Sequence, residues 1–178
     1  MIYSDISLRT LQEQGYLPKQ VYIGPSSVDL TLSNSFCVMD SPNEEYVLDA
    51  LDEQNFHYWV EDTIVLAPME FVLASTNEEI GVPVDCAAYV EGRSSVGRMG
   101  VQVQNAGFID AGFRGQITLE LQNQSKFPIR LSSGMRICQL VYVQMTSPSS
   151  SPYNGKYQFQ KGATESRLYQ DLMREVTV

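Results

Sequence analysis

A segment of mixed basic and hydroxyl residues could bind phosphate. EGRSSVGRMG, at 91–100, brings together two arginines, two serines and a glycine: Arg93, Ser94, Ser95, Gly97 and Arg98. Guanidinium groups and hydroxyls donate hydrogen bonds to phosphate oxygens, and a glycine allows close approach of the backbone. The two serines could instead cap a short helix, which is a common use of serine.

A second segment combines an acidic side chain with several glycines. NAGFIDAGFRGQ, at 105–116, has three glycines within nine residues and Asp110 near its centre. Glycines permit tight turns, and the exposed backbone of such a hairpin could hydrogen-bond the edge of a base. Asp110 could orient a water molecule or a sugar hydroxyl. Alternatively, the segment is a bulged hairpin in which Asp110 bonds only its own turn.

The third segment, ITLELQN at 117–123, has the alternation of a half-buried strand. Ile117, Leu119 and Leu121 would share one face, with Thr118 and Glu120 on the other. Glu120 could simply face solvent. If a neighbouring subunit or a ligand covered that face, burial would raise the pKa of the carboxylate and suit it to act as a general base.

The elements expected to position these segments are mostly short strands. Alternating apolar and polar residues predict a strand over 27–39, and further strands are expected at 63–75 (split in two by Pro68), 86–92, 100–104, 115–123, 127–131 and 136–145. A helix is predicted over 4–14, with Ser4 as its cap and Gly15 at its end. Residues 40–62 are acidic and loop-like. The expected fold is mainly β, a β-sandwich or jelly roll with an N-terminal helix.

The last third of the chain differs from the rest. Residues 146–162 are rich in serine, proline, glycine and aromatic residues. Composition alone favours a disordered tail. The alternative is a lid over 146–178 that orders over a ligand, because this region offers rings and hydrogen-bond donors: Tyr153, Lys156, Tyr157 and Gln160.

Composition limits the function classes. The 178 residues fit one domain, 1–178, and the net charge of −9 argues against binding to nucleic acid. No apolar run is long enough to cross a membrane, and the N-terminus has no export signal, so a cytoplasmic location is the default expectation. The three separated cysteines suit a reducing compartment. His57 is the only histidine and no C-x-x-C pair occurs, so a zinc deaminase site cannot readily be assembled.

In combination, these motifs are far more specific than each alone. RSSVGR, GFIDAGFRG with Asp110, ITLEL with Glu120 and GMRICQLVY occur in that order. This order resembles the dCTP deaminase branch of the dUTPase-like family, in which the glutamate of TLEL distinguishes deaminases from dUTPases. The resemblance extends from PSSVDLTL, near residue 26, through KYQFQKG to the SR at 166–167.

The resemblance implies a distorted jelly roll, a homotrimer with sites between subunits, and Mg²⁺ bound through the nucleotide phosphates rather than by side chains. It implies that Glu120 is the general base for attack of water on C4 of cytosine, that Ser94 and Arg98 position that water, and that Asp110 contacts the deoxyribose. Phe113 matches the aromatic residue on which the sugar packs. The implied nucleotide contacts are Arg93, Ser94, Ser95, Val96, Gly97, Arg98, Asp110, Phe113, Thr118, Leu119, Glu120, Gln139, Tyr153, Lys156 and Gln160. The substrates would be dCTP and dUTP, with dTTP as a feedback inhibitor.

Members of this family release either dUTP or, after a second hydrolysis, dUMP and diphosphate. Gly97, Gly107 and Gln139 match the dUMP-forming type, in which Asp110 would activate a second water. Asn105 and Cys138 depart from the usual pattern and could alter base discrimination or inhibition. The alternatives are a deaminase that releases dUTP, a plain dUTPase, and a nucleotide sensor without catalysis on the same fold.

Overall fold

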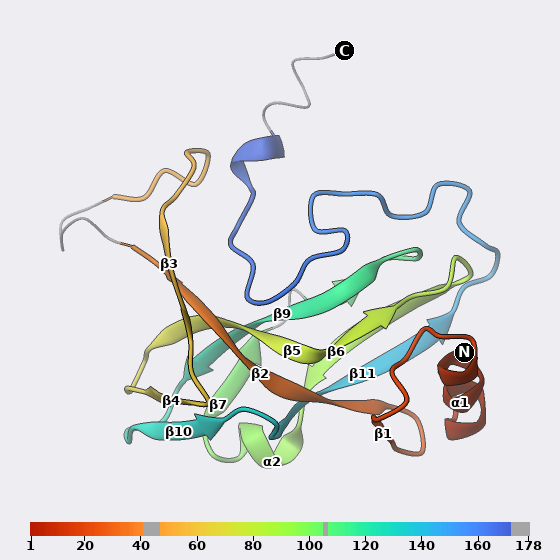
Figure 1. The fold of residues 1–178 in the computed structure, drawn as a ribbon, viewed down its shortest axis with the longest axis horizontal. Coiled ribbons are helices and arrows are strands. Elements are labelled where there is room, and N and C mark those ends of the chain that lie inside the picture. The colour runs from red at the N-terminus through yellow and green to blue at the C-terminus, as the bar shows by residue number, and fades with distance from the viewer. Residues whose placement is uncertain (41–46, 105–106, 172–178) are drawn as a thin grey trace.

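The computed structural model describes residues 1–40, 47–104 and 107–171, and it is built mostly from β-strands (Figure 1). In chain order the elements are α1 (Asp5–Glu13), β1 (Tyr22–Ile23), β2 (Val28–Met39), β3 (Phe56–Val60), β4 (Thr63–Leu66), β5 (Phe71–Gly81), β6 (Cys86–Gly92), α2 (Ser94–Gly97), β7 (Val101–Gln104), β8 (Phe108–Ile109), β9 (Arg114–Asn123), β10 (Ile129–Ser132) and β11 (Arg136–Gln144). All the strand pairs between them are antiparallel.

The long strand β2 joins the two halves of the main sheet, whose order is β7-β9-β5-β2-β11-β6-β8. Its first residues, Val28 to Thr31, pair with β11, and its later residues pair with β5 and β3. The register with β5 shifts between Leu32 and Phe36. Because β2 changes partners along its length, the sheet is curled, and β4 and β10 form a separate small sheet beside it.

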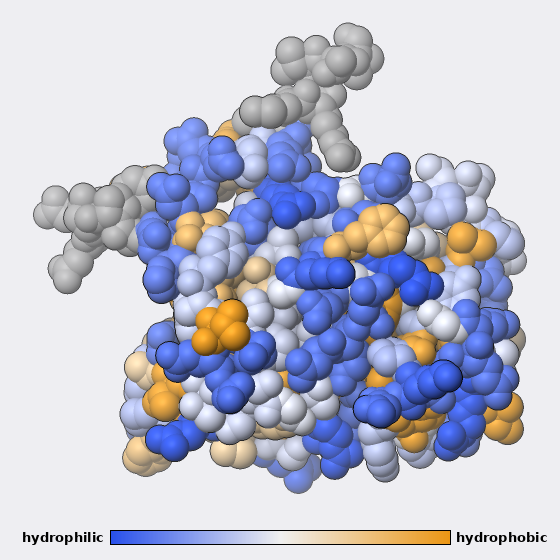
Figure 2. Space-filling model, viewed as in Figure 1, coloured by the Kyte–Doolittle hydropathy of each residue, from blue (hydrophilic) through white to orange (hydrophobic). Residues whose placement is uncertain are grey.

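The core is formed by the alternating side chains that the sequence predicts. Along β9, buried and half-buried residues alternate without a break. Phe36, Leu140 and Tyr142 are among the large side chains with no exposed surface. The Tyr142 hydroxyl donates a hydrogen bond of 2.7 Å to the carbonyl of Gly81, so this buried polar group is paired. The outer face shown in Figure 2 is mainly hydrophilic, with hydrophobic groups scattered over it.

The N-terminal helix is one residue shorter at each end than predicted. Leu8 and Leu11 are buried, and Gly15 takes a positive φ of 80° just beyond the helix, as expected for a helix end. Ser4 occupies the N-cap position, but its hydroxyl makes no capping bond. The predicted capping contact is therefore wrong, although the position of the cap is right.

The predicted strands are confirmed to within two residues at most boundaries, and Pro68 does separate β4 from β5. The main correction concerns residues 40–62, which were expected to form a loop. Within them β3 pairs with the second half of β2, from Ser35 to Met39. Residues 41–46 of that expected loop, and Asn105, lie outside the described residues. The short strands β1 and β8 were also missed.

The C-terminal segment is packed against the rest of the structure as far as Asp171, so the disordered tail that composition favours over 146–162 is wrong. It runs along the edge of β9 and the turn before it, and it is the blue end of the ribbon in Figure 1. The Tyr153 amide donates to the carbonyl of Ala111 at 2.8 Å, and the Phe159 amide donates to that of Arg114 at 2.8 Å. The bond to Arg114 lies on the edge of β9 away from β5, at the end that β7 does not reach, because β7 pairs with β9 only between Glu120 and Asn123. None of the helices in the described ranges is long and apolar enough to cross a membrane.

Candidate active site

A cavity of about 430 Å³ lies between β9, the turn that precedes it and the C-terminal segment. Seven of the predicted nucleotide contacts line it: Asp110, Phe113, Thr118, Leu119, Glu120, Tyr153 and Gln160. Gly107, which matches the dUMP-forming type, also lines it. The lining also includes Leu73, Val90, Val103, Phe108, Ile109, Ile117, Tyr157, Thr164, Glu165 and Ser166. The apolar walls and the few polar groups that converge there are typical of a small-molecule site.

The polar face of β9 supplies Thr118 and Glu120. Both are half-buried, whereas the adjacent Ile117 and Leu119 point to the other face and are buried. The Thr118 hydroxyl accepts a hydrogen bond of 3.2 Å from the amide of Thr164. This face of the strand is therefore covered by the chain's own C-terminal segment, which encloses Glu120 more than an exposed strand would.

Phe113 and Tyr153 form one wall of the cavity. Phe113 is 7% exposed, and the centroids of the two rings are 5.9 Å apart. The approach of the C-terminal segment depends on Gly112, where φ is 91° and a Cβ atom would lie 2.6 Å from Cβ of Pro152. A glycine in the GFID-type hairpin thus allows the lid to lie against it.

Asp110 lies in the turn between β8 and β9. Its backbone carbonyl accepts a bond of 3.2 Å from the amide of Phe113, and the residue is exposed. The turn is thus closed by the carbonyl of Asp110, and the residue is also among those that line the cavity.

The C-terminal segment brings Gln160 to the cavity but does not bring Lys156 there. The Gln160 side chain donates to the carbonyl of Gln116 at 2.8 Å. The Lys156 ammonium group lies 2.7 Å from the carboxylate of Asp171 and 2.9 Å from the carbonyl of Arg167. In this structure Lys156 is therefore paired within the segment itself.

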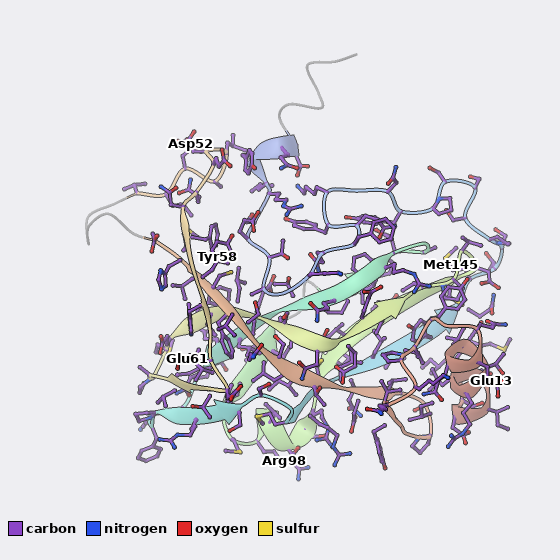
Figure 3. All side chains as sticks on the ribbon, in the orientation of Figure 1. Glu13, Asp52, Tyr58, Glu61, Arg98 and Met145 are labelled. Atoms are coloured by element: carbon purple, nitrogen blue, oxygen red, sulfur yellow. The ribbon has the colours of Figure 1, made fainter. Side chains whose placement is uncertain are left out.

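The RSSVGR residues form a second group, on and around α2. Arg93 is the N-cap residue, and no side chain caps this short helix, so the capping role considered for the serines is wrong. Ser94, Ser95, Gly97 and Arg98 are exposed, whereas Val96 is buried in the core. None of them lines the cavity. In Figure 1, α2 lies at the edge of the molecule opposite the C-terminal segment, and Figure 3 places Arg98 at that edge.

Beside α2 the structure shows a carboxylate that sequence reasoning missed. Oδ2 of Asp29 lies 3.4 Å from the Arg93 guanidinium and 3.0 Å from that of Arg136. On the neighbouring strand Gln139 lies opposite Asp29 in the register, and its amide donates to the Ser27 hydroxyl at 3.2 Å. A signal existed in the sequence, because Asp29 stands among apolar residues in PSSVDLTL.

Glu165 is a second cavity residue that the sequence did not indicate. Its carboxylate accepts bonds from the hydroxyl of Tyr58 at 2.7 Å and from Nε of Arg167 at 3.2 Å. Burial by itself would raise the pKa of Glu165. The hydrogen bonds from Tyr58 and Arg167 outweigh burial, so the pKa of Glu165 lies below its ordinary value.

The donor groups suit a metal ion that arrives with a ligand. Within the described ranges no three His, Cys, Asp or Glu side chains are grouped to hold an ion. Mg²⁺ commonly keeps several waters and binds largely through substrate phosphates, so an ion carried by a nucleotide does not require such a group. His57 lies on β3, with its ring stacked 5.7 Å from that of Trp59.

Comparison with known proteins identifies the family of this chain. The family described as "dCTP deaminase-like" matches residues 3–145. A protein of Sulfurihydrogenibium sp. (strain YO3AOP1) named "dCTP deaminase, dUMP-forming" is 42% identical over 180 residues, covering 96% of this chain and 99% of its own. A protein of the same name from Aquifex aeolicus (strain VF5) is 44% identical over 177 residues, covering 96% and 97%. The chain therefore belongs to the dCTP deaminase-like family.

A solved structure supports the same assignment at the level of the fold. The crystal structure of 2'-deoxycytidine 5'-triphosphate deaminase from Agrobacterium tumefaciens is similar, with a TM-score of 0.60 and 25% identity. The match covers 79% of this chain and 47% of that one, so this chain spans about half the length of that protein. The mainly β, dUTPase-like distorted jelly roll with its N-terminal helix is thus confirmed.

Proposed function

We propose that this protein converts dCTP and two water molecules into dUMP, diphosphate and ammonia in the cytoplasm. The observation that carries the proposal is that Glu120 and Asp110, one carboxylate for each hydrolysis, line the same cavity. The names of the relatives, "dCTP deaminase, dUMP-forming", support both the substrate and the product.

The complete site lies between subunits of a homotrimer. One subunit holds Glu120 and Asp110 in its cavity, but its own Ser94 and Arg98 are exposed on α2 and do not reach that cavity. In a ring of three identical subunits, every α2 can face the cavity of a neighbour. Such a ring gives each cavity the guanidinium and hydroxyl groups that it lacks by itself.

Deamination proceeds without zinc. Glu120 takes a proton from a water molecule as the water oxygen bonds to C4 of cytosine, and it returns that proton to N3. A second proton transfer, from the new hydroxyl on C4 to the exocyclic nitrogen, lets the C4–N4 bond break, so that ammonia leaves and C4 becomes the carbonyl carbon of uracil. General acid–base help of this kind contributes roughly 10²–10⁴-fold in rate. Ser94 and Arg98 of the neighbouring subunit orient the water and stabilise the charge that develops at C4.

Hydrolysis of the triphosphate is assigned to Asp110. Its carboxylate takes a proton from a second water as that oxygen bonds to the α-phosphorus, and the bond to the bridging oxygen breaks to release diphosphate. Mg²⁺, when bound to the phosphates, supplies charge neutralisation and Lewis acidity. Arg93, Ser95, Lys156 and Gln160 contact the phosphates, with Lys156 leaving Asp171 to do so, and Phe113 packs against the deoxyribose.

Gly107 supports the two-step outcome. A Cβ atom at this position would lie 2.6 Å from the carbonyl oxygen of Val90, so a bulkier residue requires the turn beside Asp110 to move. Gly97 has open space around it and is not required sterically. With glycine at 107, the Val90 amide donates a hydrogen bond of 2.9 Å to the Gly107 carbonyl, and no side chain projects from Gly107 toward Val90. Glycine at 107 therefore lets the turn that carries Asp110 keep its position against Val90.

The test of this function is ammonia release from dCTP. We expect the purified protein with Mg²⁺ to release ammonia from dCTP, to cleave dUTP added in its place, and to be inhibited by dTTP. Cleavage of dUTP without ammonia release from dCTP would mean that the protein is a plain dUTPase. Binding of both nucleotides with no turnover would mean that it is a sensor.

A further inference from the structure

The buried carboxylate of Asp29 stands between two arginines. Its side chain is 4% exposed, whereas those of Arg93 and Arg136 are 25% and 44% exposed. Both guanidinium groups contact the same oxygen, Oδ2, at 3.4 Å and 3.0 Å. The group therefore carries two positive charges and one negative charge, and only the positive ones reach the surface.

Asp29 lies among buried apolar residues of β2, where a carboxylate without a partner would be unfavourable. The neighbouring residues, Val28 and Leu30, have no exposed surface, and burial of an unpaired carboxylate is strongly unfavourable. The two arginines offset that penalty. Arg136 is in turn held by the ring of Tyr22, with its guanidinium carbon 4.8 Å from the ring centroid. Asp29 is thus held in place, and it holds the guanidinium groups of Arg93 and Arg136 in turn.

Arg93 connects this carboxylate to α2. Its carbonyl accepts the amides of Val96 and Gly97 at 3.0 Å each, so it begins the helix that carries the exposed serines. Its side chain points to Asp29. A guanidinium group has five N–H donors, and one ion-pair contact leaves others available to an anion. A tethered arginine also loses less conformational freedom when it binds a phosphate.

We propose that Asp29 is a positioning residue for the nucleotide's phosphates. It holds the guanidinium group of Arg93, with Arg136 beside it, in the direction from which the triphosphate is bound. The proposal rests on the function proposed above, since it assigns Arg93 to the phosphates. It predicts that loss of the Asp29 charge weakens the binding of phosphate and leaves the binding of the nucleoside unchanged.

The test uses Asp29→Asn, which keeps the shape of the side chain and removes its charge. Binding of inorganic triphosphate and of deoxyuridine would be measured separately by calorimetry, at one Mg²⁺ concentration, on the full-length protein. We expect the Kd of inorganic triphosphate to rise about tenfold, the size of effect typical of one charged hydrogen bond, and the Kd of deoxyuridine to stay the same.

Glu78→Gln is the matched control. Glu78 also presents a carboxylate to β2, where it accepts bonds of 2.8 Å from the amide and hydroxyl of Thr31, but no salt bridge joins it to an arginine among the described residues. This variant should lower the melting temperature without changing the Kd of triphosphate. A merely structural role for Asp29 would make Asp29→Asn behave like Glu78→Gln, and that result would overturn the proposal.

Two further results would also decide the question. Equal weakening of triphosphate and deoxyuridine by Asp29→Asn would overturn the proposal. If Asp29→Asn did not fold, Asp29→Glu, which keeps the charge and moves it by one methylene group, should raise the Kd of triphosphate alone, and unchanged binding would refute the idea. Because binding is measured without turnover, a wild-type protein that binds triphosphate but does not act on dCTP would refute the proposed function and leave this inference to be judged separately.

Discussion

The hydroxyl of Tyr58 lies 2.7 Å from Oε2 of Glu165, and this bond joins residues that are 107 positions apart in the chain. Tyr58 belongs to β3, which pairs with β2, while Glu165 lines the cavity. The labelled Tyr58 in Figure 3 lies on the strand that rises beside the C-terminal segment. The strand that sequence analysis missed therefore holds the lid in place over the candidate active site.

Removal of this bond should loosen the lid. We expect Tyr58→Phe to speed hydrogen exchange at the amides of Ala163 and Thr164, which bond the hydroxyls of Ser35 and Thr118. A lost hydrogen bond of about 0.5–1.5 kcal/mol corresponds to roughly twofold to tenfold faster exchange by local opening. Tyr89→Phe, at an exposed tyrosine of β6, is the control and should leave these amides unchanged. Identical exchange in both variants would show that Tyr58 does not hold the lid.

The same contact should make stability depend on pH. The pKa of Glu165 is lower in the folded protein than in the unfolded chain, so its charge stabilises the fold above the ordinary glutamate pKa of about 4.3. That contribution is lost as the pH falls through the folded-state pKa. We expect the wild-type protein to melt at a higher temperature than Glu165→Gln at neutral pH, and the difference to shrink below about pH 4. A difference that grew on acidification would contradict the assignment.

Gly112 tests the path of the lid independently. Gly112→Ala combines a positive φ with a Cβ atom only 2.6 Å from Pro152, so it should raise the exchange rate of the Tyr153 amide and lower the melting temperature. Gly134→Ala is a matched control because φ is 82° there and no atom lies within 4 Å of the new Cβ. Strain at a positive φ alone amounts to roughly 1–3 kcal/mol in both variants. Only Gly112→Ala should release the lid, and equal exchange at Tyr153 in the two variants would argue against this docking.

A site shared between subunits predicts complementation. Arg98→Ala and Glu120→Gln should each lose deamination almost completely. After random mixing of the two kinds of subunit, some sites combine a normal Arg98 with a normal Glu120, and the expected recovery is about a quarter of wild-type activity per site. Ammonia release from dCTP measures the recovery. Mixed trimers that stay inactive would place both residues in the same subunit's site.

The alternation of β9 was enough to predict both the strand and the pairing of Thr118 with Glu120 on one face, because a period of two is a local property of the chain. The strand β3 was not predicted, since FHYWV does not alternate and follows an acidic stretch. Its aromatic and β-branched residues favour a strand, but its pairing with β2 is a long-range contact.

The composition of the tail suggested disorder because its many serines, prolines and glycines bury little surface. Its docking depends instead on backbone bonds to the edge of β9, such as that from Phe159 to Arg114, which composition cannot show. Similarly, nothing in the spacing of Asp29 and Arg93 indicates that β2 lies beside the start of α2. Side chains that act within one strand were predicted from the sequence, and those that meet only through sheet pairing were not.

The most direct measurement is of the first product formed from dCTP. The protein would be incubated with dCTP and Mg²⁺, quenched early, and its nucleotides separated by anion exchange, with Asp110→Asn treated in parallel. We predict that the wild-type protein yields dUMP and diphosphate without accumulation of dUTP, and that Asp110→Asn accumulates dUTP because deamination by Glu120 continues. Accumulation of dUTP by the wild-type protein would contradict the account, since the cavity would then support deamination alone.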